Sequence, residues 1–229
     1  MHLAIDTTTS KSLIALKSDG ELIERQFEPK STQKVIFSEL ANLLAPDILD
    51  GITAITVGLG PGSFTGVKIG VMAAKTLAWS RSIPIAGVCS LDAVAAGTPL
   101  PDDTDVNLVV AVPSTRGEAY IRIYRQDNDC WVPEGGIIDV RLVLSELESL
   151  IPLRKLIVSG EACRELVEII KMKWICECPD VQFTTPRASG LFKLGEDKYS
   201  TGQTDDPLAI TPMYIRPSQP ERIEREKLS

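Results

Sequence analysis

The chain has 229 residues, which is enough for one large domain or two small ones with cores of their own. Hydrophobic residues make up 44% and charged residues 24%, as in ordinary globular proteins, and the formal net charge is −7. An acidic chain argues against a stand-alone nucleic-acid surface, which needs a basic patch. No segment has the ~20 apolar residues of a membrane span. The first residues do not resemble a signal peptide. We therefore expect a cytoplasmic protein without membrane contact.

Three antiparallel strands are expected first, over His2–Asp6, Ser12–Leu16 and Glu21–Phe27, because short apolar runs are separated by polar turns. A helix then follows over Thr32–Leu44. Its apolar positions recur at the spacing of one helical face and include Ile36, Leu40 and Leu43.

The most informative segment runs from Gly58 to Trp79. It combines a strand end, a glycine-rich loop and a helix expected over Ser63–Ser80. Small residues recur every four positions along one face of this helix, at Gly62, Gly66, Gly70, Ala74 and Ala78. The other faces are apolar, with Phe64, Val67, Val71, Met72, Leu77 and Trp79, and the only cations among them are Lys68 and Lys75. A stripe without side chains permits another backbone to approach closely, which predicts a packing surface.

A strand over Ile83–Ser90 and a short helix capped by Ser90 complete the first half. The proline-rich, acidic segment Thr98–Asp105 is typical of a linker. Strands then alternate with helices again, and the last helix is expected over Ala188–Tyr199. The division that we predict is therefore a subdomain over residues 1–101, a second over 102–200, and an extended segment with a mobile tail over 201–229.

Two turns are candidates for binding a nucleotide. Asp6 ends the first strand before Thr7, Thr8 and Thr9, and such a turn can hold phosphate and a hydrated metal ion. The alternative is a local turn in which Asp6 satisfies the backbone, and the spacing favours it. The loop Gly60–Gly66 also resembles a phosphate loop, but no Gly-Lys-Ser/Thr follows, and a tight turn capped by Ser63 or Thr65 is the alternative.

Reactive side chains are few. The chain has one histidine, His2, so no paired-histidine metal site and no catalytic triad without His2 can be drawn. Its five cysteines are odd in number and irregularly spaced, which argues against a disulfide framework. Cys176 and Cys178 form a C-x-C pair without a second pair. We expect no metal site and no catalytic residues.

Four motifs occur in order: M-x-L-A-I-D-T-T-T at the start, G-L-G-P-G-S-F-T-G-V-K-I-G from Gly58, R-G-E-x-Y from Arg116, and P-x-Y-I-R from Pro212. Together they closely resemble the TsaB (YeaZ) family over nearly the whole chain. The resemblance implies an α/β fold of the actin/hexokinase/Hsp70 (ASKHA) type, with two related subdomains and mixed β-sheets. That agrees with the repeated pattern of the two halves.

The resemblance also implies a role in tRNA modification. TsaB-like proteins are inactive, glycoprotease-like relatives of TsaD-like proteins, which transfer threonylcarbamoyl to adenosine 37 of tRNA (t6A biosynthesis). They form a complex with a TsaD-like subunit and a TsaE-like ATPase, so ATP, magnesium and tRNA are expected to bind only through the complex. An independent ATP-dependent phosphotransferase or ATPase, using Asp6 and Thr7–Thr9, is the alternative.

In this family the first two helices pack against the equivalent pair of TsaD, or against a second copy when TsaD is absent. Here these are the helices over 32–44 and 63–80, and we expect the interface to comprise Ile36, Leu40, Leu43, Gly66, Lys68, Gly70, Val71, Ala74 and Lys75. Two places depart from the family pattern: Pro113–Arg116 replace a usual Asp-Ala-Arg-Arg, and Gln33 and Lys34 lie near the place of a usual His-Ser pair.

Overall fold

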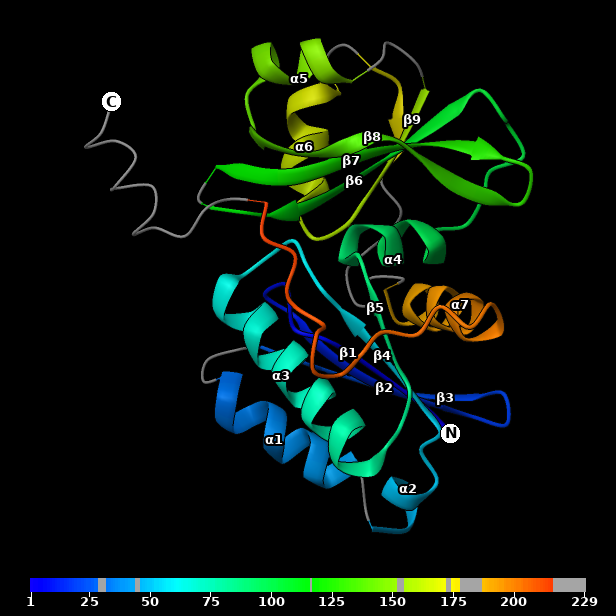
Figure 1. Ribbon diagram of the computed structural model, residues 1–229. Helices are drawn as coiled ribbons and strands as arrows, with labels where there is room; N and C mark the ends of the chain where they lie inside the picture. Colours follow the sequence, from blue (N-terminus) through cyan, green and yellow to red (C-terminus); the bar gives the residue numbers. More distant parts are fainter. Residues whose placement is uncertain are drawn as a thin grey trace.

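A computed structural model of the chain describes residues 1–28, 32–43, 46–115, 117–151, 155–171, 174–177 and 187–215 (Figure 1). Its elements in chain order are β1 His2–Asp6, β2 Ser12–Ser18, β3 Glu21–Phe27, α1 Thr32–Leu43, α2 Pro46–Asp50, β4 Ala54–Gly58, α3 Phe64–Arg81, β5 Ile85–Val88, α4 Ser90–Gly97, β6 Val106–Pro113, β7 Glu118–Asp127, β8 Cys130–Arg141, α5 Leu144–Leu150, β9 Lys155–Ser159, α6 Cys163–Ile170, β10 Cys176–Glu177 and α7 Arg187–Ser200. No helix in the described ranges is long and apolar enough to cross a membrane.

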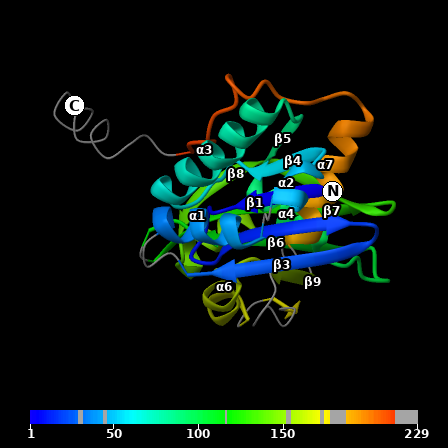
Figure 2. The same cartoon turned by 90° about the horizontal axis from the view of Figure 1, so that it is seen from below.

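The first sheet has the strand order β3-β2-β1-β4-β5. Strand β1 pairs antiparallel with β2 and parallel with β4, so it lies at the centre of a mixed sheet. Because side chains alternate along a strand, Leu3 and Ile5 enter one core and Ala4 enters another. Helices α1 and α3 contribute to the first of these cores and lie on the same face of the sheet (Figures 1 and 2).

The second sheet repeats this plan. Its order is β10-β9-β6-β7-β8, and its central strand β6 pairs antiparallel with β7 and parallel with β9. Helices α5 and α6 pack in the core on one face, and α4 packs in the core on the other. The two halves therefore share one topology, which confirms the prediction of an α/β fold with two related subdomains and mixed sheets.

Helix α7 was expected to belong to the second subdomain, over residues 102–200, but it packs on the first sheet. It follows the second sheet in the chain, but Ala188, Leu191 and Phe192 pack with Ala4 and Leu13 of the first sheet. Figure 1 shows α7 beside α4, below the second sheet. Among the described helices of residues 1–101, only α4 joins α7 in this core, through Ala93, so helix α7 supplies most of the cover over the second face of the first sheet.

Most predicted elements are present, with small changes at their ends. Ser63 caps α3, and its Oγ accepts a hydrogen bond from the Gly66 amide at 3.2 Å. The cap predicted at Ser90 is wrong: α4 begins at Ser90 itself, and Cys89 precedes it without a side-chain cap. The Ser90 Oγ instead accepts from the Gly60 amide at 3.3 Å, which holds the glycine-rich loop against α4. Leu44, Arg116, Cys178 and residues 216–229 of the predicted tail lie outside the described residues.

Candidate functional site

The turn after β1 is built by Asp6. The carboxylate is fully buried, and its Oδ1 accepts hydrogen bonds from the Thr8 amide at 2.9 Å and the Thr8 hydroxyl at 2.6 Å. The Thr7 hydroxyl donates to the Gly66 carbonyl at 2.6 Å. This is the local turn that the spacing favoured, because Asp6 and Thr7 satisfy groups of the chain itself.

Arg187 joins this turn to both subdomains. Its side chain is 1% exposed, and its Nη1 donates to the Thr9 hydroxyl at 2.6 Å. The guanidinium lies 3.8 Å from the Asp6 carboxylate and 3.7 Å from that of Glu161. Glu161, which follows β9 in the second sheet, also accepts from the Thr9 hydroxyl and, at 2.8 Å, from the Ser10 hydroxyl.

We call Asp6, Thr9, Ser10, Glu161 and Arg187 the turn cluster. It holds the end of β1 against the second subdomain with one cation and two carboxylates. Two of its atoms, Asp6 Oδ2 and Arg187 Nε, are buried without a hydrogen-bond partner. The candidate nucleotide residues Asp6, Thr7, Thr8 and Thr9 are all buried and bonded within the chain.

Sequence reasoning missed Arg187 and Glu161. No motif marks them, and they lie far from the turn in the chain. Only a buried charge in the folded structure identifies them, because a cation that is removed from water needs anionic partners.

The small-residue stripe of α3 faces the chain's own first turn. A Cβ at Gly66 would clash with the Thr7 carbonyl oxygen, one at Gly70 with the Thr7 hydroxyl, and one at Gly62 with the Thr8 carbonyl oxygen. Ala74 and Ala78 are fully buried in the same core. The interpretation of this stripe as a surface for docking another protein is therefore wrong: its glycines let α3 approach the β1 turn.

Most of the expected interface residues are likewise buried in the isolated chain. They belong to the core between α1, α3 and the first sheet, or line the β1 turn: Ile36, Leu40, Leu43, Gly66, Gly70, Val71 and Ala74. In the isolated chain these residues expose little surface to a partner. Of the expected set, Lys68 is exposed and Lys75 is half-buried.

The outer face of α3 carries the exposed side chains instead. Phe64, Lys68, Met72 and Trp79 lie within roughly 80° of one another around a helix with 3.6 residues per turn. Phe64 is 46% exposed, Met72 59% and Trp79 64%. The i, i+4, i+8 spacing of Phe64, Lys68 and Met72 was visible in the sequence. We call these four residues the α3 face.

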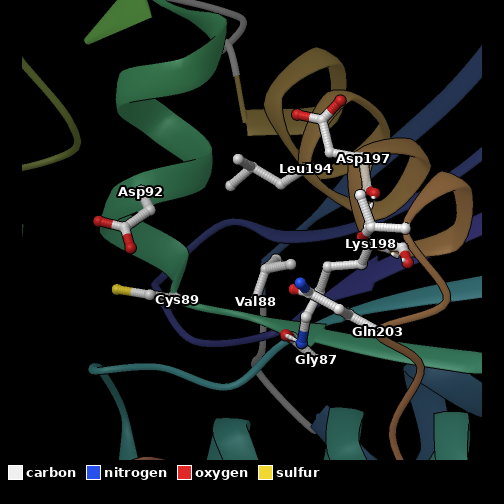
Figure 3. A pocket seen from close by; sticks show the side chains of 9 residues that line it. Gly87, Val88, Cys89, Asp92, Leu194, Asp197, Lys198 and Gln203 are labelled. Atoms are coloured by element: carbon white, nitrogen blue, oxygen red, sulfur yellow. Dashed lines mark hydrogen bonds between the residues drawn. The ribbon is translucent and has the colours of Figure 1, made fainter. Parts of the chain in front are cut away.

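A pocket of about 410 Å³ lies between β5, α4 and α7 (Figure 3). Two of its charged groups serve the fold. Asp92 accepts hydrogen bonds from Arg122 Nη1 at 2.9 Å and from the Tyr124 hydroxyl at 2.7 Å. Lys198 Nζ donates to the Gly87 carbonyl at 2.9 Å and contacts the Asp205 carboxylate at 3.0 Å.

The surroundings of Cys89 make the thiol in this pocket unreactive. Burial, with a smaller contribution from the Asp92 charge, raises the pKa of Cys89 to about 11, so it stays protonated near neutral pH. The pocket therefore offers no activated nucleophile. Within the described ranges, no three His, Cys, Asp or Glu side chains converge as metal ligands. Cys178 of the predicted C-x-C pair lies outside these ranges.

The single histidine supports the fold. The His2 ring is buried, shares a 2.7 Å hydrogen bond with the Thr56 hydroxyl, and lies edge-on to Phe192 and Tyr199. Burial lowers the pKa of His2 to about 4, against a smaller opposing effect of Glu196. It is therefore neutral near pH 7 and fixes α7 on the first sheet.

Comparison with known proteins gives a family-model match and several sequence relatives. Residues 41–133 match the family model of "TsaD: tRNA N6-adenosine threonylcarbamoyltransferase". The chain is 34% identical over 134 residues to the tRNA threonylcarbamoyladenosine biosynthesis protein TsaB of Escherichia coli, covering 56% of this chain and 57% of that protein. It is 37% identical over 130 residues to the protein of the same name from Bacillus subtilis, covering 55% and 56%. The matches thus span little more than half of these relatives.

The structural comparison extends over the whole fold. YeaZ from Pseudomonas aeruginosa superimposes with a TM-score of 0.72 at 21% identity, covering 93% of this chain and 99% of that one. At this identity the likeness establishes the fold. Together, the sequence relatives and the fold confirm the resemblance to the TsaB (YeaZ) family that the four motifs indicated.

Proposed function

We propose that this chain acts in t6A biosynthesis as a non-catalytic subunit that docks through the α3 face onto a TsaD-like catalytic subunit. The exposed row of Phe64, Met72 and Trp79 is the observation that carries the proposal. Large apolar side chains clustered on one exposed helix face are typical of protein–protein contact surfaces. The names of the sequence relatives supply the pathway.

The charge of α3 favours a partner of complementary sign. The helix contains Lys68, Lys75 and Arg81 and no acidic residue, although the whole chain has a net charge of −7. Arg81 is paired with Asp50 at 2.7 Å, whereas Lys68 extends over the Phe64 ring. A helix face with apolar residues and carboxylates would complement this surface.

A role without catalysis agrees with the state of the β1 turn. Asp6 is paired with Arg187, and the Thr9 hydroxyl is bonded to Arg187 and Glu161 of the same chain. An independent ATPase would need Asp6 and the threonines free to hold phosphate and metal, so the turn gives the alternative no support. In the proposed complex, ATP and magnesium bind to the TsaD-like and TsaE-like subunits, and tRNA binds through the assembly.

The decisive experiment measures binding of the purified chain to the TsaD-like subunit of the same organism. Met72→Glu and Trp79→Glu place a charge on the α3 face without disturbing the core, and we expect each to weaken binding at least a hundredfold. Leu22→Glu is the matched control, because Leu22 is also exposed but lies on β3. Thermal unfolding checks that all three variants are folded. A folded Met72→Glu variant that binds like the unmodified chain would exclude this interface.

The pathway assignment needs its own test. We expect a reaction containing TsaD-like and TsaE-like subunits, ATP, magnesium, tRNA and a threonylcarbamoyl donor to form t6A only when this chain is added. Met72→Glu should abolish that stimulation. Product formed equally well without the chain would contradict the proposed function.

A further inference from the structure

The segment after α7 runs beside β5 and α3. Residues 205–215, which we call the strap, follow α7 and run along the first subdomain (Figures 1 and 2). The strap begins at Asp205, which forms an antiparallel bridge with Ile85 and accepts a hydrogen bond from the Gly87 amide at 2.8 Å. Its start is thereby fixed to the edge strand of the first sheet.

Lys75 fixes the middle of the strap to α3. Its Nζ donates to the carbonyl oxygens of Leu208 and Ile210, each at 3.2 Å. Ile210 is buried in the core under α3, and the Met213 amide donates to the Leu59 carbonyl at 2.7 Å. Lys75 thus bonds α3 to the strap of the same chain, whereas the family resemblance assigned it to the interface with a partner.

The far end of the strap places Tyr214 on the α3 face. The centres of the Tyr214 and Phe64 rings lie 5.0 Å apart, and each of the two residues is 46% exposed. Lys68 Nζ lies 3.9 Å from the Phe64 ring centre. Nine large apolar side chains are exposed among the described residues, and five of them lie on α3 and the strap: Phe64, Met72, Trp79, Leu208 and Tyr214.

We propose that the strap is part of the docking surface, and that Tyr214 and Phe64 form one joint aromatic anchor for the TsaD-like partner. This inference rests on the proposed function and adds to it a second contact element. Half-exposed aromatic rings that touch each other gain most when a partner covers them, and aromatic residues are frequent at the centres of interfaces.

Charge identifies the kind of partner. Lys68 borders the anchor and has no carboxylate partner in the described part of the chain. In a two-fold pair of identical chains centred on the anchor, two Lys68 cations would approach each other. A partner with a carboxylate beside an apolar pocket would instead pair with Lys68 while it covers Phe64 and Tyr214.

The test compares Tyr214→Ala, Phe64→Ala and their double variant in calorimetric binding to the TsaD-like subunit. We expect each single variant to raise the Kd at least tenfold. The double variant should raise it by less than the product of the two effects, because one ring supports the other. Tyr214→Phe should bind like the unmodified chain, since the anchor uses the ring. Lys75→Gln, which loosens the strap, should also weaken binding.

The outcomes separate the two proposals. If Met72→Glu abolishes binding while Tyr214→Ala binds like the unmodified chain, the strap inference fails and the proposed interface stands. If both variants bind like the unmodified chain, both proposals fail. The alternative occupant of the anchor is a second copy of this chain, and sedimentation of the chain alone tests it. If the chain is a dimer that Tyr214→Ala dissociates, and if Tyr214→Ala leaves binding to the TsaD-like subunit unchanged, the anchor belongs to the second copy.

Discussion

Arg187 Nη1 donates a hydrogen bond to the Thr9 hydroxyl at 2.6 Å, although 178 positions separate the two residues in the chain. The contact connects the first residue of α7 to the turn after β1, and Glu161 adds the second subdomain. One buried cation therefore holds three distant segments together at the junction of the subdomains.

We expect Arg187→Met to destabilise the chain strongly, because it leaves the buried Asp6 carboxylate and the mostly buried Glu161 carboxylate without a cation. Breaking a buried pair from one side costs about 3–5 kcal/mol. Adding Glu161→Gln should restore part of the loss, since one unpaired charge is removed. The free energy of unfolding in urea measures both changes. Arg141→Met is the control: its surface pair with Glu146 should contribute less than ~1 kcal/mol. If Arg187→Met lowered the free energy of unfolding as little as Arg141→Met does, the turn cluster would not stabilise the fold.

The glycine face of α3 gives a second prediction. A Cβ at Gly70 meets the Thr7 hydroxyl, and one at Gly66 meets the Thr7 backbone carbonyl. Gly70→Ala and Gly66→Ala should each cost roughly 1–3 kcal/mol through overpacking. In a Thr7→Ala background, Gly70→Ala should become much less costly, because its obstacle is gone.

Gly66→Ala is the internal control for that experiment. Thr7→Ala leaves the backbone carbonyl in place, so the cost of Gly66→Ala should persist. Urea unfolding of the single and double variants measures both couplings. If Thr7→Ala reduced the cost in unfolding free energy of Gly66→Ala and Gly70→Ala equally, α3 would not lie on the β1 turn as described.

His2 makes stability depend on pH. Its pKa is lowered from 6.5 to about 4 chiefly by burial, so between these values the unfolded chain binds a proton that the folded chain excludes. Stability should therefore rise with pH through this window, and it should be roughly 2 kcal/mol lower at pH 5 than at pH 7.5 on account of His2. Urea unfolding of the unmodified chain and of His2→Gln measures the effect. A His2→Gln variant with an unchanged pH dependence would refute the assignment.

The free cysteines Cys89 and Cys130 should differ in reactivity. The Cys89 thiol is buried with its pKa raised to about 11, whereas Cys130 is exposed. Alkylation by iodoacetamide at pH 8 should be on the order of a hundredfold slower at Cys89, because the thiolate is the reacting form. Peptide mass spectrometry follows both sites. In urea the two rates should become similar, and a fast reaction of Cys89 in the folded chain would disprove its burial.

The local elements follow from the sequence because their causes are local. The apolar runs at His2–Asp6 and Val106–Pro113 form the central strands of the two sheets, and Ser63 caps α3. The repeated order of strands and helices was sufficient to predict two related subdomains. The motif at Gly58–Gly70 was sufficient to indicate the family.

The orientation of the helices depends on contacts between distant segments. Periodicity showed that α3 has a small face and apolar faces, but not that Thr7 would fill the small one and leave Phe64, Met72 and Trp79 exposed. The same holds for α7, whose sequence does not specify which sheet it covers. The sequence by itself determined the elements, their order and the family resemblance. The tertiary structure decided which residues can meet a partner, because burial depends on packing across the whole chain.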